Sequence, residues 1–359
     1  MKERFVLIVI LTLYTVFSYS QDITDVKVEQ TPFIYDKIFE INQHKPVKLV
    51  TYLENVYYND AIVQRDTLYQ EHLTADNKRL SYTSFNKNKT KLTALYKYFP
   101  EKHVQEWRDQ DLNEVNYNRL IKNRFGKNQT LYQARVFKGD TTSRTYTKFI
   151  YNSDSLLVKK SFEGSYGVNK LGTSATTYDY INKNMVLSKS YYDTSKSSFY
   201  QAITYKYNAE NLPVEKKAYQ VRNNIPDTPA LYTYYTYDKG LLVNEKYEDF
   251  NDKAKKTVTT VDYYYNSNKQ LIKLHTKSDT LFKIIVYEYG GEKLKKATIQ
   301  TNTLIGLNRE ERVYVYDKSK LPLTFVRLFE YDEFGNVIRL KYFLNGQRQH
   351  EFVKELVYY

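Results

Sequence analysis

The sequence contains no cysteine, and it has only 11 glycines, 7 prolines and 1 tryptophan among 359 residues. Without cysteine, the chain has no disulfide bonds, no thiolate metal ligands and no acylated N-terminal cysteine. The fold must therefore be held together by buried surface and hydrogen bonds.

Long apolar runs are also scarce. The one clear run, from Phe5 to Phe17, follows a basic start and ends in small residues at Ser18 and Ser20. This order predicts a secretory signal peptide at residues 1–20. The alternative, an uncleaved anchor, is disfavoured because about 13 residues fall short of the roughly 20 that span a bilayer. We expect an exported protein, in the periplasm, on the cell surface or outside the cell, with no transmembrane helix in the mature chain.

Acidic residues are fewer than basic ones, 41 against 54, and the formal net charge is +13. Such an excess favours acidic partners, among them anionic glycans, lipid headgroups and nucleic acid. Export disfavours nucleic acid. The alternative interpretation is a lysine-rich β surface whose charge keeps it soluble.

Tyrosine is abundant, with 39 copies. Many tyrosines belong to aromatic pairs at positions i and i+2, and a turn-forming Asn, Asp or Gly follows nearly every pair. The pairs are Phe149/Tyr151, Tyr178/Tyr180, Tyr205/Tyr207, Tyr235/Tyr237, Tyr263/Tyr265, Tyr287/Tyr289, Tyr314/Tyr316 and Phe329/Tyr331. A spacing of two places both rings on one face of a strand, whereas on a helix they would point apart.

An aliphatic residue follows each pair, five or six positions after the second aromatic. These residues are Leu156, Met185, Leu212, Leu242, Leu271, Leu294, Leu321 and Val337. Asn, Asp and Gly between an aromatic strand end and an aliphatic restart supply the backbone conformations that a hairpin turn needs. Each unit therefore predicts one β-hairpin.

The spacing of the units predicts how the hairpins connect. Second aromatics lie 24 to 30 residues apart, except that Tyr316 and Tyr331 lie 15 apart. The longer spacing fits two strands and their two connections. The shorter spacing fits one strand and one turn, so that a single strand is both the return strand of one unit and the aromatic strand of the next. The fold class is therefore all-β: an antiparallel meander of repeated hairpins in an extended, twisted or curled sheet. An open sheet and a closed cylinder both remain compatible with this pattern.

Weaker copies at 81–98 and 123–137 extend the predicted repeat domain to residues 51–359. Residues 21–50 lack the motif, and we expect them to cap the array. Opposite the repeated turns, the connections vary in length, at 164–177, 193–198, 220–230, 249–256 and 300–308. We expect these loops to recognise a ligand. The equally weighted alternative is that their length varies without any function.

Two units, YTYDKGLL (235–242) and FEYDEFGNVI (329–338), resemble the YD repeat, YxYDxxGxL, of Rhs-type and teneurin-like proteins. The exported, Tyr-rich chain is also similar to YD-repeat proteins of the Bacteroidetes lineage. It departs from the family because the motif glycine stands in its expected place only at Gly240 and Gly335, and because its period is longer. The resemblance implies a β-repeat fold and export. Large relatives build a β shell around a toxin, but this chain has too few units for encapsulation, and no catalytic residue carries over.

Catalytic, cofactor and metal motifs are missing. No two of the five histidines have the spacing of metal ligands: they are His44, His72, His103, His275 and His350. GSYG at 164–167 differs from a hydrolase nucleophile elbow and fits a glycine-rich loop. DQDLNE at 109–114 imitates a calcium loop, but Glu114 replaces the required glycine and Leu120 the final carboxylate. We therefore expect no enzyme activity, no cofactor and no metal.

The leading hypothesis is an exported, non-enzymatic β-repeat protein that binds or scaffolds at the cell envelope. Its expected partner is a polysaccharide, such as an anionic glycan, or an envelope protein. Tyrosines that alternate with lysines predict either a packed sheet surface or a platform for sugar rings, and the lone Trp107 is open to the same two interpretations. The alternatives are an outer-membrane β-barrel, which charge on both faces of 214–224 disfavours, and an enzyme with a site on the irregular loops. The sequence assigns no binding residue and no oligomeric state.

Overall fold

The computed structural model describes residues 45–359 apart from 59–60, 77, 86–90, 100–103, 111–113, 124–125, 139, 167–168, 192–199, 223–224, 227–229, 251–255, 280 and 303–322. The predicted signal peptide at 1–20 and most of the predicted cap at 21–50 lie outside the described residues. So do the aromatic pair Tyr314/Tyr316 and the connection at 193–198.

The described chain is built of β-strands. Their bounds are β1 Val47–Tyr58, β2 Ala61–Leu73, β3 Arg79–Phe85, β4 Lys91–Phe99, β5 Val104–Gln110, β6 Glu114–Lys122, β7 Asn128–Phe137, β8 Asp140–Tyr151, β9 Leu157–Tyr166, β10 Asn169–Ile181, β11 Asn184–Tyr191, β12 Gln201–Tyr207, β13 Pro213–Arg222, β14 Ile225–Pro226, β15 Leu231–Asp238, β16 Leu241–Asp249, β17 Thr257–Tyr265, β18 Leu271–Lys277, β19 Phe282–Gly290, β20 Lys293–Thr301, β21 Leu323–Tyr331, β22 Val337–Leu344 and β23 Gln347–Tyr358.

The strands form one antiparallel meander. Each strand pairs with the next, except that the short β14 pairs only with β13, which also pairs with β15. The predicted all-β meander is confirmed, including the single strand β21 that runs through LTFVRL into FEY.

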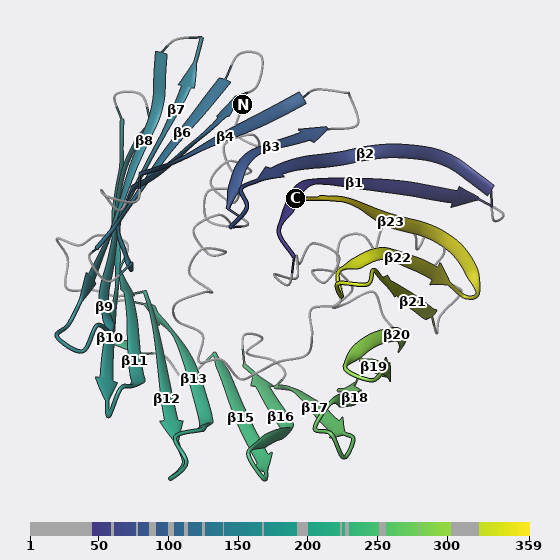
Figure 1. Cartoon of the computed structure of the whole chain (residues 1–359). Helices are drawn as coiled ribbons and strands as arrows, with labels where there is room; N and C mark the ends of the chain where they lie inside the picture. The colour runs from purple at the N-terminus through teal and green to yellow at the C-terminus, as the bar shows by residue number, and fades with distance from the viewer. Residues whose placement is uncertain are drawn as a thin grey trace.

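The first and last strands lie side by side. β1 pairs with β2 on one edge and with β23 on the other, so the sequence of pairings returns to its first strand. Figure 1 shows the strands arranged around a central space, with the C-terminus beside β1. The described array therefore does not end in the two exposed edges for which we expected caps, and the boundary at residue 50 falls inside β1.

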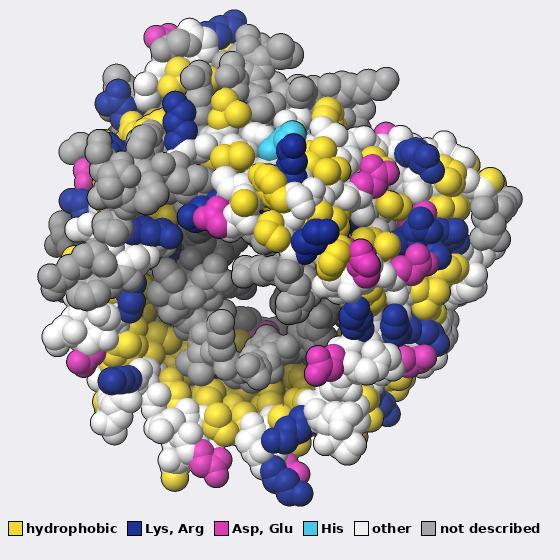
Figure 2. Space-filling model, viewed as in Figure 1, with side chains coloured by type: hydrophobic (Ala, Val, Ile, Leu, Met, Phe, Trp, Pro, Cys, Tyr) yellow, Lys and Arg dark blue, Asp and Glu magenta, His cyan; other side chains and the backbone are white. Residues whose placement is uncertain are grey.

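The core lies on one face of the sheet, here called the core face. Its largest cluster covers β16 to β23, and a second covers β7 to β12. First aromatics of the repeat, such as Phe149, Tyr205 and Phe329, are buried in these clusters, and second aromatics such as Tyr151 pack against them. Both rings of a pair thus share a face, as the i, i+2 spacing predicts. Figure 2 shows hydrophobic side chains gathered on the wall of the central hollow, over β13 to β16.

Four repeated turns share one backbone structure. Each starts with Asn152, Asn208, Asn266 or Asp332, whose Oδ1 accepts the backbone N–H of the residue four positions later at 2.8–2.9 Å. In each, the residue before that donor has positive φ: Ser155, Asn211, Lys269 or Gly335. The side-chain acceptor at the start stabilises the turn, so glycine is not obligatory at the position of positive φ. This explains why the motif glycine is mostly missing.

A second repeated feature joins neighbouring hairpins. The hydroxyl of each described second aromatic donates a hydrogen bond of 2.7–3.0 Å to a backbone carbonyl near the start of the preceding return strand. We call this contact the tyrosine latch; its pairs are Tyr151–Asn128, Tyr180–Leu157, Tyr207–Met185, Tyr237–Pro213, Tyr265–Leu242, Tyr289–Leu271 and Tyr331–Leu294.

The latch compensates for backbone pairing that stops short of the turn. Between β18 and β19, for example, the register begins at Lys273 and Val286, so the carbonyl of Leu271 lies beyond the ladder and accepts from Tyr289 instead. All eight second aromatics are tyrosine, whereas two of the first aromatics are phenylalanine. That difference is the sequence signal of the latch, and the spacing argument overlooked it.

Two of the predicted irregular loops contain strand residues. In 164–177, β9 continues to Tyr166 and β10 begins at Asn169, so GSYG lies in a hairpin and the glycine-rich loop predicted there is wrong. In 220–230, β13 continues to Arg222 and pairs with β14. Thr and Tyr favour β-strands. In 164–177 this preference outweighs the tendency of the glycines to form a loop.

Candidate binding surfaces

The histidines form no metal site in the described part of the chain. His350 is buried, with Nδ1 2.9 Å from Oε1 of Glu54 on β1, and His275 packs edge-on against Phe282. His72 is exposed on β2, while His44 and His103 lie outside the described residues. No group of three His, Asp or Glu side chains in the described ranges could hold a metal ion.

The calcium-like segment includes the end of one strand and the start of the next. Asp109 and Gln110 end β5, Glu114 begins β6, and 111–113 fall outside the described residues. Trp107 lies within β5.

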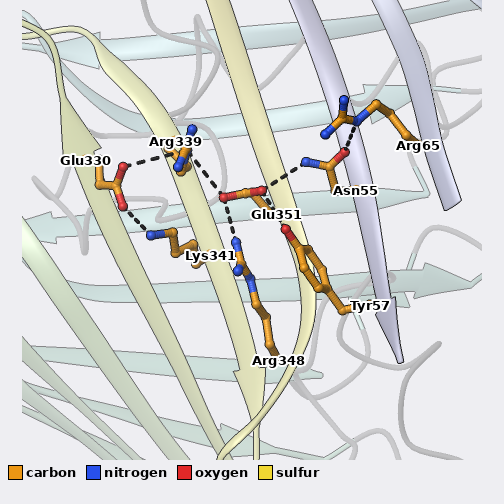
Figure 3. Close-up of polar contacts among 8 residues, drawn as sticks. All are labelled: Asn55, Tyr57, Arg65, Glu330, Arg339, Lys341, Arg348 and Glu351. Carbon is orange, nitrogen blue, oxygen red and sulfur yellow. Dashed lines mark hydrogen bonds and ion pairs between the residues drawn. The ribbon is translucent and has the colours of Figure 1, made fainter. Parts of the chain in front are cut away.

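A group of linked polar side chains lies where β1 meets β23. We call it the seam cluster; it consists of Asn55, Tyr57, Arg65, Glu330, Arg339, Lys341, Arg348 and Glu351 (Figure 3).

Glu351 is the centre of the seam cluster and is only 4% exposed. Its Oε2 accepts hydrogen bonds of 2.9 Å from Nδ2 of Asn55 and from the hydroxyl of Tyr57. Its Oε1 lies 2.7 Å from Nη2 of Arg348 and 3.3 Å from Nε of Arg339. The guanidinium of Arg348 also lies over the ring of Tyr57, 4.0 Å from its centroid. One carboxylate thus joins β1, β22 and β23.

Charge in the seam cluster is unequal, with four cationic side chains and two carboxylates. Glu330 pairs with Lys341 and with Arg339, and Arg65 donates from Nε to Asn55 Oδ1 at 2.9 Å. Burial alone would raise the pKa of Glu351. The hydrogen bonds from β1 and the two arginines outweigh burial, and the pKa lies below its ordinary value. Since the carboxylate contacts residues of the first and last strands, the first role of the cluster is to hold these strands together.

A different polar surface crosses β6, β7 and β8 on the face opposite the core. The rings of Tyr117 and Tyr132 have centroids 6.1 Å apart, and those of Tyr132 and Tyr146 lie 4.8 Å apart. We call these three residues the tyrosine platform. Tyr146 is 43% exposed, and the other two are half-buried. The register pairs Tyr132 directly with Tyr146, so the stacking follows from strand alignment.

Cationic side chains flank the platform. Arg119 pairs with Tyr132 in the β6–β7 register, while Arg144 and Lys148 lie two residues to either side of Tyr146. All three are exposed, and Glu163, opposite Tyr146 on β9, is the acidic neighbour. Residues two apart on a strand, or opposite each other in register, project from the same face. The surface therefore combines three aromatic rings with an excess of positive charge.

The platform lies on strands, whereas we expected recognition in the irregular loops. A signal for it exists in the sequence. Tyr117, Tyr132 and Tyr146 follow one another at 15 and 14 residues, the length of one strand and one turn, which places them side by side in a meander. None of them belongs to a repeat pair, so packing of the repeat does not account for them.

No protein-family model matches the chain, and comparison with curated proteins found no match. Solved structures similar to it include TcdB2-TccC3, with 13% identity, a TM-score of 0.36 and coverage of 80% of this chain and 16% of that one. A Photorhabdus luminescens Tc holotoxin pore has 12% identity, a TM-score of 0.35 and the same coverage. A porin-like protein from Bacteroides uniformis has 8% identity, a TM-score of 0.29 and coverage of 87% and 97%. This chain spans 16% of the length of each toxin chain.

These TM-scores are too low to support an argument about function. The YD-repeat-like character is visible instead in the hairpins of the chain itself, where Tyr237-Asp238 and Tyr331-Asp332 each close a strand and open a turn. No helix among the described residues is long and apolar enough to cross a membrane.

Proposed function

We propose that the protein is an exported, non-enzymatic β-repeat protein of the cell envelope, and that it binds an acidic polysaccharide on the tyrosine platform. The observation that carries this proposal is the row of three half-buried to exposed tyrosine rings across β6 to β8, with Arg119, Arg144 and Lys148 beside it.

The exposed tyrosine rings of the platform suit a sugar as the ligand, because sugar rings can stack on them. A pyranose ring has apolar C–H faces and a polar rim, and a tyrosine ring offers an apolar face with a hydroxyl at its edge. Tyr117, Tyr132 and Tyr146 form a continuous row over three strands, which suits a polymer better than a single sugar.

The positive charge beside the tyrosine platform favours acidic polysaccharides over neutral ones. Three exposed cations face one exposed carboxylate, Glu163, and the whole chain carries a formal charge of +13. Arginine forms paired hydrogen bonds with carboxylate and sulfate groups, so Arg119 and Arg144 favour uronic or sulfated sugars over neutral ones. Affinity should therefore fall as the salt concentration rises.

A glycan array probed with residues 21–359 tests the proposal. We expect acidic polysaccharides to bind and neutral ones not to bind, and Tyr132→Ala to lower affinity for the best acidic ligand about tenfold, since loss of one stacked ring costs ~1–3 kcal/mol. The matched control is Tyr58→Ala, which removes a tyrosine that is 70% exposed and outside the platform. A uniformly blank array, or equal losses in both variants, would contradict polysaccharide binding on the platform.

A further inference from the structure

Tyr132 and Tyr146 meet two conditions for a reaction between side chains, because their rings are close together and solvent reaches them. They are direct partners in the β7–β8 register, and their ring centroids lie 4.8 Å apart with 42° between the ring planes. Tyr146 is 43% exposed and Tyr132 is half-buried, on the face opposite the core. A reagent in solution can therefore approach two neighbouring phenols.

Other side chains that react readily with oxidants are scarce in this chain. It has no cysteine and 1 tryptophan, and its two methionines are Met1, in the predicted signal peptide, and Met185, which is 8% exposed. Exposed thiols and thioethers are the side chains on which peroxide damage usually falls. With few of them present, an exposed phenol has little competition for an oxidant.

We propose that Tyr132 and Tyr146 form a site of oxidative cross-linking, at which a haem peroxidase and hydrogen peroxide join the two rings as dityrosine. The oxidised peroxidase removes one electron and one proton from each phenol, and the two radicals combine by a bond between the ring carbons next to the hydroxyl groups. The hydrogen on each bonded carbon then moves to its oxygen, which restores both phenols. One hydrogen peroxide takes up the two electrons and two protons and leaves as two water molecules.

The cross-link joins β7 to β8 within one chain. Since Tyr132 and Tyr146 already face each other in register, the bond requires only that the two side chains turn, and the strands keep their places. The reaction needs ring proximity and access to the oxidant, so it does not depend on polysaccharide binding.

Other tyrosines of the chain separate proximity from access. The rings of Tyr52 and Tyr69 have centroids 4.1 Å apart, but Tyr52 is only 2% exposed. Tyr264 is 44% exposed, much like Tyr146, yet within the described residues no aromatic ring packs against it. We therefore expect no cross-link between Tyr52 and Tyr69, and none within the chain at Tyr264.

Peptide mapping after oxidation tests the site. Residues 21–359, at low protein concentration and without polysaccharide, are treated with hydrogen peroxide and a haem peroxidase and then digested with trypsin. Trypsin places Tyr132 on peptide 128–135 and Tyr146 on peptide 145–148, so the two peptides stay together only if the rings are linked. We expect this linked pair, with a mass two hydrogen atoms below the sum of its parts and with the fluorescence of dityrosine.

Tyr146→Phe keeps the ring but removes the phenol, so it should abolish the linked pair. The matched control, Tyr264→Phe, removes an equally exposed phenol and should leave the yield of the linked pair unchanged. The inference is overturned if the parent chain gives no linked pair, if its cross-links join only separate chains, or if Tyr264 is cross-linked as often as Tyr146. Far-UV circular dichroism identifies any variant that fails to fold, and the peptide map of the parent chain decides the question in that case.

Discussion

The junctions between neighbouring hairpins and the junction between β1 and β23 are both antiparallel, yet side chains hold them differently. Between hairpins, one neutral latch supplements the ladder, as Tyr237 does for the carbonyl of Pro213. At the seam, the buried carboxylate of Glu351 binds two side chains of β1 and two arginines.

The difference follows from sequence distance. Neighbouring hairpins are copies of one another, so one residue type at one repeat position gives the same latch at each step. Asn55 and Glu351 are 296 residues apart and belong to no common repeat. The seam therefore depends on Glu351, whose carboxylate accepts hydrogen bonds from Asn55 and Tyr57 only when β23 lies beside β1.

The largest effect should come from Glu351→Gln. Removing the charge leaves Arg348 and Arg339 facing a neutral amide at a buried position, which should lower the free energy of unfolding by about 3 kcal/mol. Urea denaturation monitored by circular dichroism measures the loss. Glu355→Gln, on an exposed position of the same strand, is the control and should change little. Equal effects of both substitutions would show that the seam does not depend on this carboxylate.

Acid and alkali should separate the two kinds of junction. The pKa of Glu351 is lowered from its ordinary value of 4.5, so its contribution is present above pH 4.5 and is lost as pH falls through the lower folded pKa. The pKa of Tyr207 and of Tyr237 is raised from 10.0 to about 12, mainly by burial, so their contribution is present below pH 10 and is lost as pH rises through 12. The unfolding free energy should thus fall at both ends. In Glu351→Gln, the acid limb should become shallower while the alkaline limb stays unchanged.

A smaller loss should follow Tyr265→Phe. The ring still packs, but the carbonyl of Leu242 loses its donor, which should cost about 1 kcal/mol. Tyr264→Phe is the matched control, because its ring lies on the opposite face and is 44% exposed. That change should stay within about 0.5 kcal/mol. If the two substitutions have the same effect in urea denaturation, the latch does not contribute to stability.

The smallest effect on stability should come from Tyr132→Ala on the tyrosine platform. The platform crosses the same β7–β8 junction as the latch of Tyr151, but on the opposite face, where Tyr146 is 43% exposed. We therefore expect the midpoint of thermal unfolding to shift by less than that of Tyr265→Phe. Differential scanning calorimetry of Tyr132→Ala and Tyr265→Phe measures the two midpoints and shows which shift is larger. A larger shift for Tyr132→Ala would mean that the platform is part of the core packing.

Much of the fold could be predicted because a short pattern recurs. Spacing of two within each aromatic pair indicates strands, and an Asx residue such as Asn208 after the pair indicates the turn. The strand β21 was also predicted, since LTFVRL runs into FEY without a break. These features depend on residues close in sequence, where spacing and local hydrogen bonds decide the outcome.

The candidate surfaces were harder to predict. The tyrosine platform requires knowing that Tyr132 and Tyr146 are in register, and one extra residue in a turn would place them on opposite faces. The seam cluster has no local signal, because its members come from both ends of the described chain.

Local sequence patterns account for the repeated unit: an aromatic strand, an Asx turn and an aliphatic return strand in an antiparallel meander. The three-dimensional arrangement of the strands places β1 beside β23 and brings Asn55 to the carboxylate of Glu351. The two kinds of interaction act over different distances along the chain. Turn formation and alternation act over a few residues, whereas the meeting of distant strands depends on the twist summed over the whole sheet.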